Sequence, residues 1–299
     1  MINQTTQMTV QTGLLAALAV LTTTIPILAP TEAKAEGLSH AQLGQYAQGS
    51  SQTVDHSDWT NLLQTYVIAS PDGVNRVDYS AFQTNGHQAL KTYVSKLETV
   101  DPRTLGRNEQ FAFWANLYNA KTIDVVLDHY PVDSIRKITI NEGLFGFLKK
   151  SVGAGGPWKA KVVTIAGTPL SLDNIEHNIM RPAFKDPRVH YAVNCASYGC
   201  PNLARTAFTG QDLEQQLDTG AKAFVNHPRG ISVQGKSVTA STIYQWFKVD
   251  FGGTDKGVLD HVRQYASDDL NKKLSGINDI ASFEYDWALN NTSGTEPQG

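Results

Sequence analysis

The stretch RNEQFAFWANLYNAKTIDVVLDH, residues 107–129, decides how this chain folds. It contains neither glycine nor proline, and its apolar residues recur at helical spacing. The pair Tyr130–Pro131 follows, and a residue before proline is disfavoured in helical geometry, so the pattern ends there. A long helix over residues 107–129 is therefore predicted as the central element of the domain.

The polar residues of this helix divide into two groups. At 100° per residue, Lys121, Asp124 and Asp128 share one narrow sector, which we expect to face solvent. Asn116 and Asn119 lie nearly opposite, on the face predicted to be buried. A buried amide without a partner costs about 1–3 kcal/mol, so both should be hydrogen-bonded, either to neighbouring backbone or, in a functional interpretation, to a catalytic group or substrate.

Helical and hairpin patterns alternate on both sides of this helix. The interspersed order favours an α+β fold, a single mixed domain of helices with short antiparallel hairpins, over a doubly wound parallel sheet. The further predicted helices cover 57–66, 87–99, 172–181, 209–226, 241–248 and 255–266, and the predicted strands or hairpins cover 73–79, 160–172, 188–194 and 231–239.

The N-terminal region reads as a targeting segment. Residues 13–30 form an apolar run, and Ala33-Lys34-Ala35 follows as a small-x-small cleavage pattern, so residues 1–35 are predicted to be a secretory signal peptide. The alternative is an uncleaved membrane anchor. With cleavage, the protein is expected to be extracytoplasmic, periplasmic or secreted, with a flexible lead-in (36–54), one domain (55–289) and a disordered tail (290–299).

Composition argues against several classes of partner. The formal net charge is -3, so no overall field favours nucleic acid or an anionic membrane. No segment after the apolar run is long enough to span a membrane. The glycines at 153–156 lack the strand, lysine and hydroxyl context of a phosphate-binding loop, and no cofactor is predicted. Substrate, protein partner and oligomeric state are left open.

The predicted helix 172–181 carries three titratable residues of interest. Glu176 falls on the apolar stripe, so its carboxylate should be buried and either paired or raised in pKa. Asp173 and His177 form an i,i+4 pair beside it. One interpretation is structural, with Glu176 bound to Arg181 or Arg188. The other makes this helix part of a catalytic site.

The stretch DPRVHYAVNCASYGCPNL, residues 186–203, contains both cysteines of the chain. On a predicted strand 188–194, His190 and Asn194 share one face. Cys195 would then lie roughly 16 Å from His190 at about 3.3 Å per residue, too far for a direct nucleophile–base pair. His177, brought over by tertiary packing, is the better candidate base.

Three interpretations of the two cysteines are open. A thiol nucleophile could be Cys195, or Cys200 if Pro201 begins a helix whose dipole lowers the thiol pKa. A Cys195–Cys200 disulfide would instead fix the shape of the loop. A metal site is the third, because His177, His190, Cys195 and Cys200 make a legitimate tetrahedral zinc set.

Four blocks of this sequence resemble the DUF547 family. The blocks are FWANLYN (113–119), SLDNIEH (171–177), DPRVHYAVNC (186–195) with Gly199-Cys-Pro201, and WFKVDF (246–251). The resemblance implies an exported bacterial member of a family of unknown function, and it implies no catalytic assignment. The family's motif residues fall on Asn116, Asn119, Glu176, His177, His190, Cys195 and Cys200.

Two hypotheses follow. The first is an exported thiol-dependent hydrolase or acyl transferase, in which Cys195 is the nucleophile, His177 or His190 the base, and Asp173 or Asn116 the orienting group. Glu176 would be a buried acid or a structural partner. The second is a non-catalytic extracytoplasmic binding or scaffold domain, with a Cys195–Cys200 disulfide and buried polar residues that only hold the core.

Overall fold

The computed structural model describes residues 1–2, 37–140 and 156–292. Residues 3–35 of the predicted signal peptide, most of the 153–156 glycine stretch and the last part of the predicted tail lie outside these residues. Within them, no helix is both long enough and apolar enough to cross a membrane.

Helices and short strands alternate along the described chain. The helices are α1 (His40–Leu43), α2 (Ser57–Tyr66), α3 (Tyr79–Asn85), α4 (His87–Glu98), η1 (Pro102–Thr104), α5 (Arg107–His129), η2 (Ile135–Lys137), η4 (Asn174–Met180), α6 (Arg181–Phe184), α7 (Val189–Ala192), α8 (Leu213–Val225), α9 (Thr242–Trp246), η5 (Lys248–Phe251), α10 (Asp255–Tyr265) and α11 (Asp268–Lys273). The strands are β1 (Val67–Ala69), β2 (Asn75–Val77), β3 (Val163–Ile165), β4 (Thr168–Leu170), β5 (Ile231–Gln234), β6 (Ser237–Ser241) and β7 (Ser282–Glu284).

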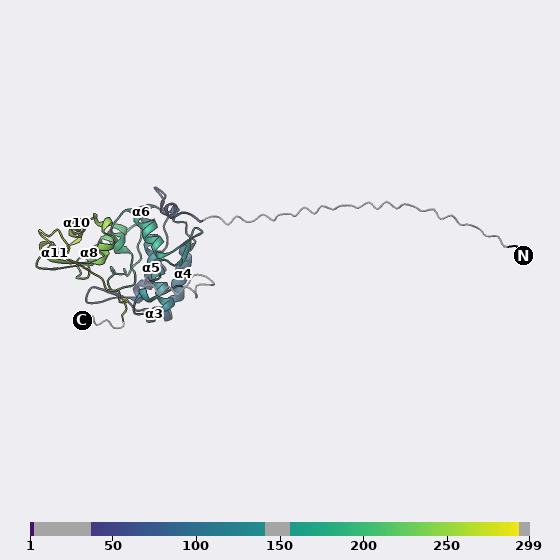
Figure 1. Ribbon diagram of the computed structural model, residues 1–299, viewed down its shortest axis with the longest axis horizontal. Coiled ribbons are helices and arrows are strands. Elements are labelled where there is room, and N and C mark those ends of the chain that lie inside the picture. Colours follow the sequence, from purple (N-terminus) through teal and green to yellow (C-terminus); the bar gives the residue numbers. More distant parts are fainter. Residues whose placement is uncertain (3–36, 141–155, 293–299) are drawn as a thin grey trace. The chain divides into compact units, whose positions relative to one another are not determined.

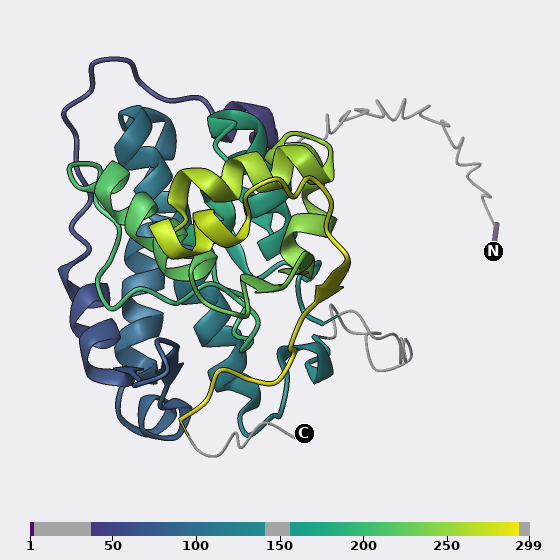
Figure 2. The same ribbon diagram turned by 90° about the vertical axis from the view of Figure 1, so that its left-hand side faces the viewer.

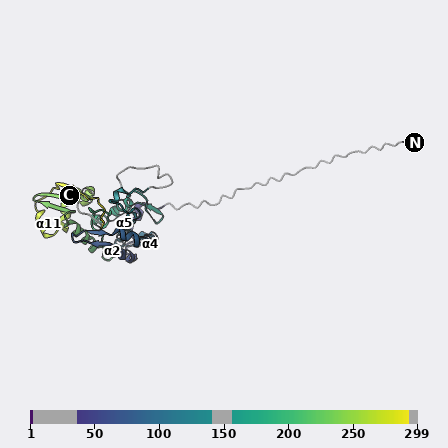
Figure 3. The same ribbon diagram turned by 90° about the horizontal axis from the view of Figure 1, so that it is seen from below.

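The central helix α5 forms as predicted, and it is buried on almost every side. α3 and α4 pack against it, and α2 packs on α4. The labels of α2, α4 and α5 lie close together in Figure 3. Its bulky apolar side chains, including Phe113 and Trp114, are fully buried in the larger of two hydrophobic clusters. Burial of this kind is the main favourable term in folding.

A second hydrophobic cluster lies among α8, α10 and the β5–β6 hairpin, in the part of Figure 1 that carries the labels α8, α10 and α11. The single-turn helix α7 lies where the two clusters meet. Val189 packs into the first cluster and Tyr191 into the second. The residue between them, His190, is thereby fixed between two cores.

The strands form three small sheets, so the predicted α+β class is confirmed. β1 with β2 and β3 with β4 are antiparallel hairpins, and β5 with β6 is a third. β7 adds to β6 in parallel, through Ser282 beside Thr239, which is a pairing that the predicted hairpins did not include. Parallel pairing follows from the long connection through α9, α10 and α11 that separates the two strands.

The predicted strand 188–194 is wrong. Residues 189–192 form α7. Just before it, the Arg188 backbone N–H donates to the Asp186 side chain, and backbone bonds from Val189 to Asp186 and from His190 to Pro187 close the turn. The chain becomes extended only at Val193. The separation of His190 from Cys195 that was inferred from strand geometry therefore does not apply.

The predicted helix start at Pro201 is also wrong. Residues 201–204 are not helical, and the Pro201 carbonyl accepts a hydrogen bond from the Asn194 side chain at 2.7 Å. Asn75 of β2 bonds the same stretch, through Asn202 and the Leu203 carbonyl. These long-range partners hold the chain in a loop, so Cys200 does not cap a helix.

The segment that follows β7 crosses the domain and joins distant parts of it (Figure 2). Leu289 donates a backbone hydrogen bond to Asp133, and Asn290 accepts one from Val77. The same segment bonds the cysteine loop, where Gly199 donates to Asp286. A side chain at position 199 would put its Cβ 2.9 Å from the Asp286 backbone, so only glycine fits there. Residues 290–292, predicted as tail, belong to this segment.

Residues 37–54, predicted as a lead-in, carry the short helix α1. Ser39 and Gln42 form a capping box that starts it, and Leu43 is fully buried. The Gln110 amide of α5 donates to the carbonyls of Leu43 and Gln45. These contacts tie the segment to the central helix.

Candidate functional site

A pocket of about 170 Å³ collects most of the predicted site residues. Residues from the η4 region, α7, the cysteine loop, α9 and the segment after β7 line it. They are Tyr118, Trp158, Asp173, Glu176, His177, His190, Val193, Cys195, Cys200, Pro201, Ile243, Trp246, Phe247, Tyr285 and Trp287. Four of the five predicted catalytic residues thus meet in one cavity, and Asn116 is the exception.

The helix that carries Glu176 and His177 is a π-helix. Its wider turn brings successive side chains to positions that an α-helix would not give, and such turns are frequent at functional sites. The expected burial of Glu176 is confirmed, because the residue is 7% exposed. Neither predicted arginine binds it. Its Oε1 atom instead lies 3.4 Å from Nδ1 of His190 and 3.9 Å from Nδ1 of His177.

His190 lies between two carboxylates. Its Nε2 atom is 2.7 Å from Oδ2 of Asp250, and its Nδ1 atom faces Glu176 at the ion-pair distance given above. The imidazole stacks on the Phe247 ring, with centroids 4.1 Å apart and an angle of 13° between the planes. Arg181 donates to the same Asp250 oxygen at 2.6 Å. These four charged groups form a chain from η5 to the pocket.

The environment of this chain favours its charged form. Burial alone would lower the pKa of His190, but Asp250 and Glu176 outweigh burial and the pKa is raised. Burial would raise the pKa of Glu176, yet the His190 contact and the charges of His177 and Arg181 hold that pKa below its ordinary value. The pKa of Asp250 is lowered in the same way, against burial, by His190 and Arg181. The structure therefore favours an imidazolium between two carboxylates.

His177 lies at the more open side of the pocket. The predicted i,i+4 pair with Asp173 is present, with Nε2 and Oδ1 3.8 Å apart. Its ring also packs near Phe247, at 5.5 Å between centroids. His177 is half-buried, so it can contact both Glu176 and a molecule in the pocket.

Cys195 and Cys200 form a disulfide, with their Cα atoms 6.3 Å apart. The Tyr285 hydroxyl lies 2.9 Å from the sulfur of Cys195 and 3.1 Å from that of Cys200. The disulfide interpretation is therefore confirmed. In this state neither sulfur is a thiolate, so the zinc set with His177 and His190 is not assembled.

Aromatic rings form one wall of the pocket. Trp158 packs edge-on to Trp287, Trp287 packs on Trp246, and both Trp246 and Trp287 contact Tyr285, with centroid distances of 4.6–5.6 Å. Trp246 is 47% exposed, which is unusual for so large an apolar side chain. An exposed tryptophan beside a cavity is a typical ligand platform.

The two amides of α5 lie elsewhere. Asn116 donates to the Phe208 carbonyl and accepts from the Phe208 backbone N–H. Asn119 donates to the Ala192 carbonyl and accepts from the Asn194 N–H. Their predicted burial is confirmed, and their partners are backbone. Asn119 still matters to the site, because it clamps the chain that links α7 to the cysteine loop.

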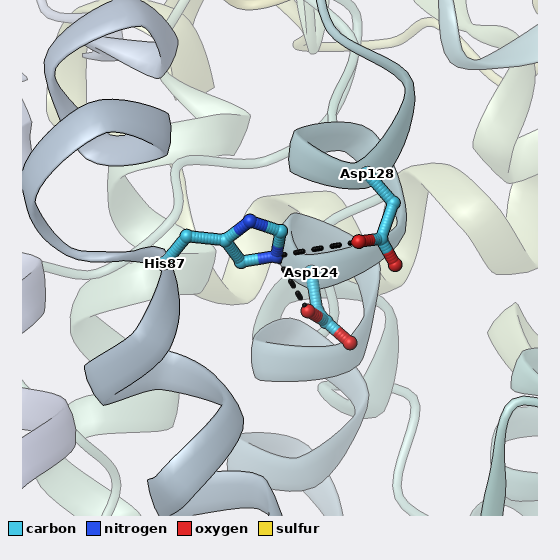
Figure 4. A group of neighbouring side chains, drawn as sticks. All are labelled: His87, Asp124 and Asp128. Atoms are coloured by element: carbon cyan, nitrogen blue, oxygen red, sulfur yellow. Dashed lines mark hydrogen bonds and ion pairs between the residues drawn. The ribbon is translucent and has the colours of Figure 1, made fainter.

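The prediction that Lys121, Asp124 and Asp128 all face solvent is wrong for the first two, which are buried. Figure 4 shows that Asp124 and Asp128 both point at His87 of α4, with Nε2–oxygen distances of 2.8 and 3.6 Å. Such a trio has the composition of a metal site.

Two lysine ammonium groups, however, already form ion pairs with the aspartates of this cluster. Lys121 lies 2.6 Å from Asp124, and Lys91 lies 3.0 and 2.9 Å from Asp124 and Asp128. A cation of the protein thus stands where a metal would bind, so we interpret the cluster as an ion-pair network between α4 and α5.

Several residues in or behind the pocket escaped the sequence reasoning. Asp250 lies within the WFKVDF block but carried no signal of its own, because only tertiary packing brings it to His190. Tyr118 lies in the FWANLYN block, directly before Asn119. From the sequence it could not be distinguished from the core aromatic residues of the same helix. Burial, followed by the charges of Glu176 and Asp173, raises its pKa well above the ordinary value. Tyr285 and Trp287 lie outside every block.

Comparison with known proteins assigns part of the chain. Residues 102–225 match the family model described as "Protein of unknown function, DUF547". The match covers α5, the π-helix, α7 and both cysteines, whereas the WFKVDF block and the segment after β7 lie beyond it. No curated protein and no solved structure matches the chain. Residues 102–225 are therefore assigned to the DUF547 family, whose description gives no function.

Proposed function

We propose that the pocket is the active site of a hydrolase or transferase that works by acid–base catalysis, with Glu176 as the base. The observation that carries the proposal is the chain Asp250–His190–Glu176, in which a buried imidazole between two carboxylates ends at the cavity. A carboxylate held in this way stays ionised and can accept a proton, as a general base requires.

The neighbouring groups supply the other parts of such a reaction. Glu176 takes a proton from water or from an acceptor group, and the atom that loses the proton attacks the carbonyl carbon of the substrate. His177 lines the same cavity beside Glu176, and it gives a proton to the leaving group as the bond of that group to the carbon breaks. Tyr118, whose raised pKa keeps it protonated, lines the same cavity as a hydrogen-bond donor for the developing oxyanion.

A thiol-dependent reaction is the second candidate, and one observation favours it. Cys195 and His177 line the same pocket, and the Cys195 sulfur contacts the Tyr285 hydroxyl. Reduction of the disulfide would free Cys195 as a nucleophile with His177 as its base. In this version the enzyme is silent until a reductant opens the Cys195–Cys200 bond.

The experiment measures hydrolysis of an aryl ester and of an aminoacyl anilide, with and without a phosphine reductant. Glu176→Gln and His177→Asn are compared with Asp269→Asn, an exposed control on α11. The acid–base proposal expects turnover without reductant, a loss of about 10²–10⁴-fold in kcat in both site variants, and normal activity in the control.

Other results separate the candidates. Activity that appears only with reductant, and disappears in Cys195→Ser, supports the thiol reaction and excludes the acid–base proposal. Absence of turnover under both conditions, with ligand binding retained in the pocket, favours a non-catalytic binding domain. A double variant, Cys195→Ser with Cys200→Ser, that keeps full activity excludes a role for the sulfurs.

We further propose that the protein works outside the cytoplasm, after removal of residues 1–35. The disulfide supports this proposal, because such bonds persist in oxidising compartments and are rare in the cytosol. Fractionation of cells that express the chain, with mass determination of its N-terminus, tests both the location and the cleavage after Ala35.

A further inference from the structure

The charges at the inner end of the pocket cancel in pairs. Arg181 lies 2.6 Å from Asp250, and His190 lies against both Asp250 and Glu176. Two cations and two carboxylates therefore form a neutral chain behind the cavity. Asp173 also lines the pocket, and its carboxylate is not part of this neutral chain of side chains.

Asp173 is placed to meet a ligand. Among the described residues its carboxylate has one ion-pair partner within 4 Å, His177 at 3.8 Å, and its side chain is 29% exposed. Its backbone N–H donates to the Trp158 carbonyl at 3.0 Å, which fixes the residue beside that tryptophan. The carboxylate thus lies at the edge of the aromatic wall.

The wall itself suits a cation. Trp158, Trp246 and Trp287 form a continuous series of indoles, and neither lysine nor arginine is among the described residues that line the cavity. Outside the cavity, Arg136 already stacks on Trp287, with its guanidinium carbon 5.2 Å from the ring centroid. The faces of indole rings carry negative potential and attract cationic groups.

We propose that the pocket binds its ligand through a primary ammonium group, held between Asp173 and the indoles of Trp158 and Trp246. An anionic ligand would meet the carboxylates of Asp173 and Glu176 at the same cavity, and a neutral one would leave Asp173 with His177 as its one ion-pair partner within 4 Å among the described residues. Whether the bound amine then accepts a transferred group or is part of the cleaved molecule rests on the proposed function. The binding of the amine does not.

The test compares two probes on the full-length protein. Nα-acetyl-lysine methyl ester carries the ammonium, and Nα-acetyl-norleucine methyl ester has the same backbone and a neutral side chain. Affinity is measured by calorimetry and by tryptophan fluorescence. The expected result is that wild-type protein binds the lysine probe at least tenfold more tightly than the norleucine probe.

Variants then locate the preference. Asp173→Asn should remove the tenfold preference and leave the norleucine probe unaffected, whereas Asp269→Asn, which changes net charge equally at an exposed site, should change neither. Trp246→Leu should weaken the binding of the lysine probe. Equal affinity for the two probes in wild-type protein overturns the proposal without requiring any variant, and so does an unchanged preference in Asp173→Asn.

Glu176→Gln separates this inference from the proposed function. If the variant keeps the ammonium preference and wild-type protein turns over no ester or anilide, the inference holds and the catalytic proposal fails. If wild-type protein shows turnover but no ammonium preference, the catalytic proposal holds and the inference fails.

Discussion

The Nε2 atom of His190 lies 2.7 Å from the Oδ2 atom of Asp250, although 60 positions of sequence separate the two residues. This contact joins α7, which lies between the two hydrophobic clusters, to η5 at the edge of the second. It also sets the charge of the imidazole that faces Glu176. The fold and the chemistry of the pocket therefore depend on the same pair.

His190→Gln should reveal this pair as a pH-dependent contribution to stability. The raised pKa means that the folded protein holds the His190 proton more tightly than the unfolded chain does. The stabilisation is complete below the ordinary value of 6.5 and is lost as the pH rises through the folded-state pKa. Urea unfolding of wild type and variant at pH 6, 7.5 and 9 should show a difference in free energy that shrinks with pH.

His261→Gln is the matched control for that measurement. His261 is also buried, but burial lowers its pKa to about 4. The unfolded chain therefore binds the proton more tightly, and the contribution is lost as the pH falls from about 6.5 towards 4. Its effect should be constant between pH 7.5 and 9. Parallel curves for the two variants in that range would contradict the charged state assigned to His190.

Removal of the disulfide should destabilise the protein only moderately. The two cysteines are five positions apart, and closure of so short a loop contributes about 2 kcal/mol by chain entropy. Cys200→Ser should therefore lower the free energy of unfolding by about 2 kcal/mol, measured in urea without reductant. Wild-type protein should take up two equivalents of a thiol reagent only after reduction. Labelling of unreduced, folded protein would show that the thiols are free.

Asn119→Ala should be more damaging than most single substitutions on α5. The side chain satisfies one carbonyl and one N–H, and both would be left buried and unpaired. At about 1–3 kcal/mol each, the expected loss is about 2–6 kcal/mol. Asn61→Ala, at an exposed position of α2, is the control and should change stability by less than about 0.5 kcal/mol. Equal effects would show that the amide is not a structural clamp.

The cluster of His87, Asp124 and Asp128 should not respond to metal. Lys91 already contacts both carboxylates, so a divalent ion would have to displace a paired ammonium. Millimolar zinc, or a chelator, should leave the melting temperature of wild-type protein unchanged. A zinc-dependent rise that His87→Ala abolishes would refute the ion-pair interpretation.

Much of this architecture is predictable from local patterns. α5 and the hairpins at β3–β4 and β5–β6 follow from helical spacing and turn residues, and the burial of Asn116, Asn119 and Glu176 follows from the helical faces. These features depend on neighbours within a few positions, where periodicity carries the information.

The features that escaped prediction depend on distant partners. Residues 188–194 alternate like a strand, yet the turn before Val189 and the contacts of Val189 and Tyr191 with two separate cores favour a helical turn. The burial of Lys121 and Asp124 likewise requires α4, which supplies Lys91 and His87. No pattern in the nearby sequence indicates the pairing of β7 with β6 or the role of Asp250.

The pocket depends on the segment after β7, which is the last part of the described chain. Tyr285 and Trp287 supply part of its wall, while Leu289 and Asn290 bond to parts of the chain far upstream. A chain that has lost this segment, by proteolysis or incomplete docking, would lack Tyr285 and Trp287 from the wall and the backbone bonds of Leu289 and Asn290. The wall of the cavity is therefore complete only when the segment after β7 is docked on the rest of the domain.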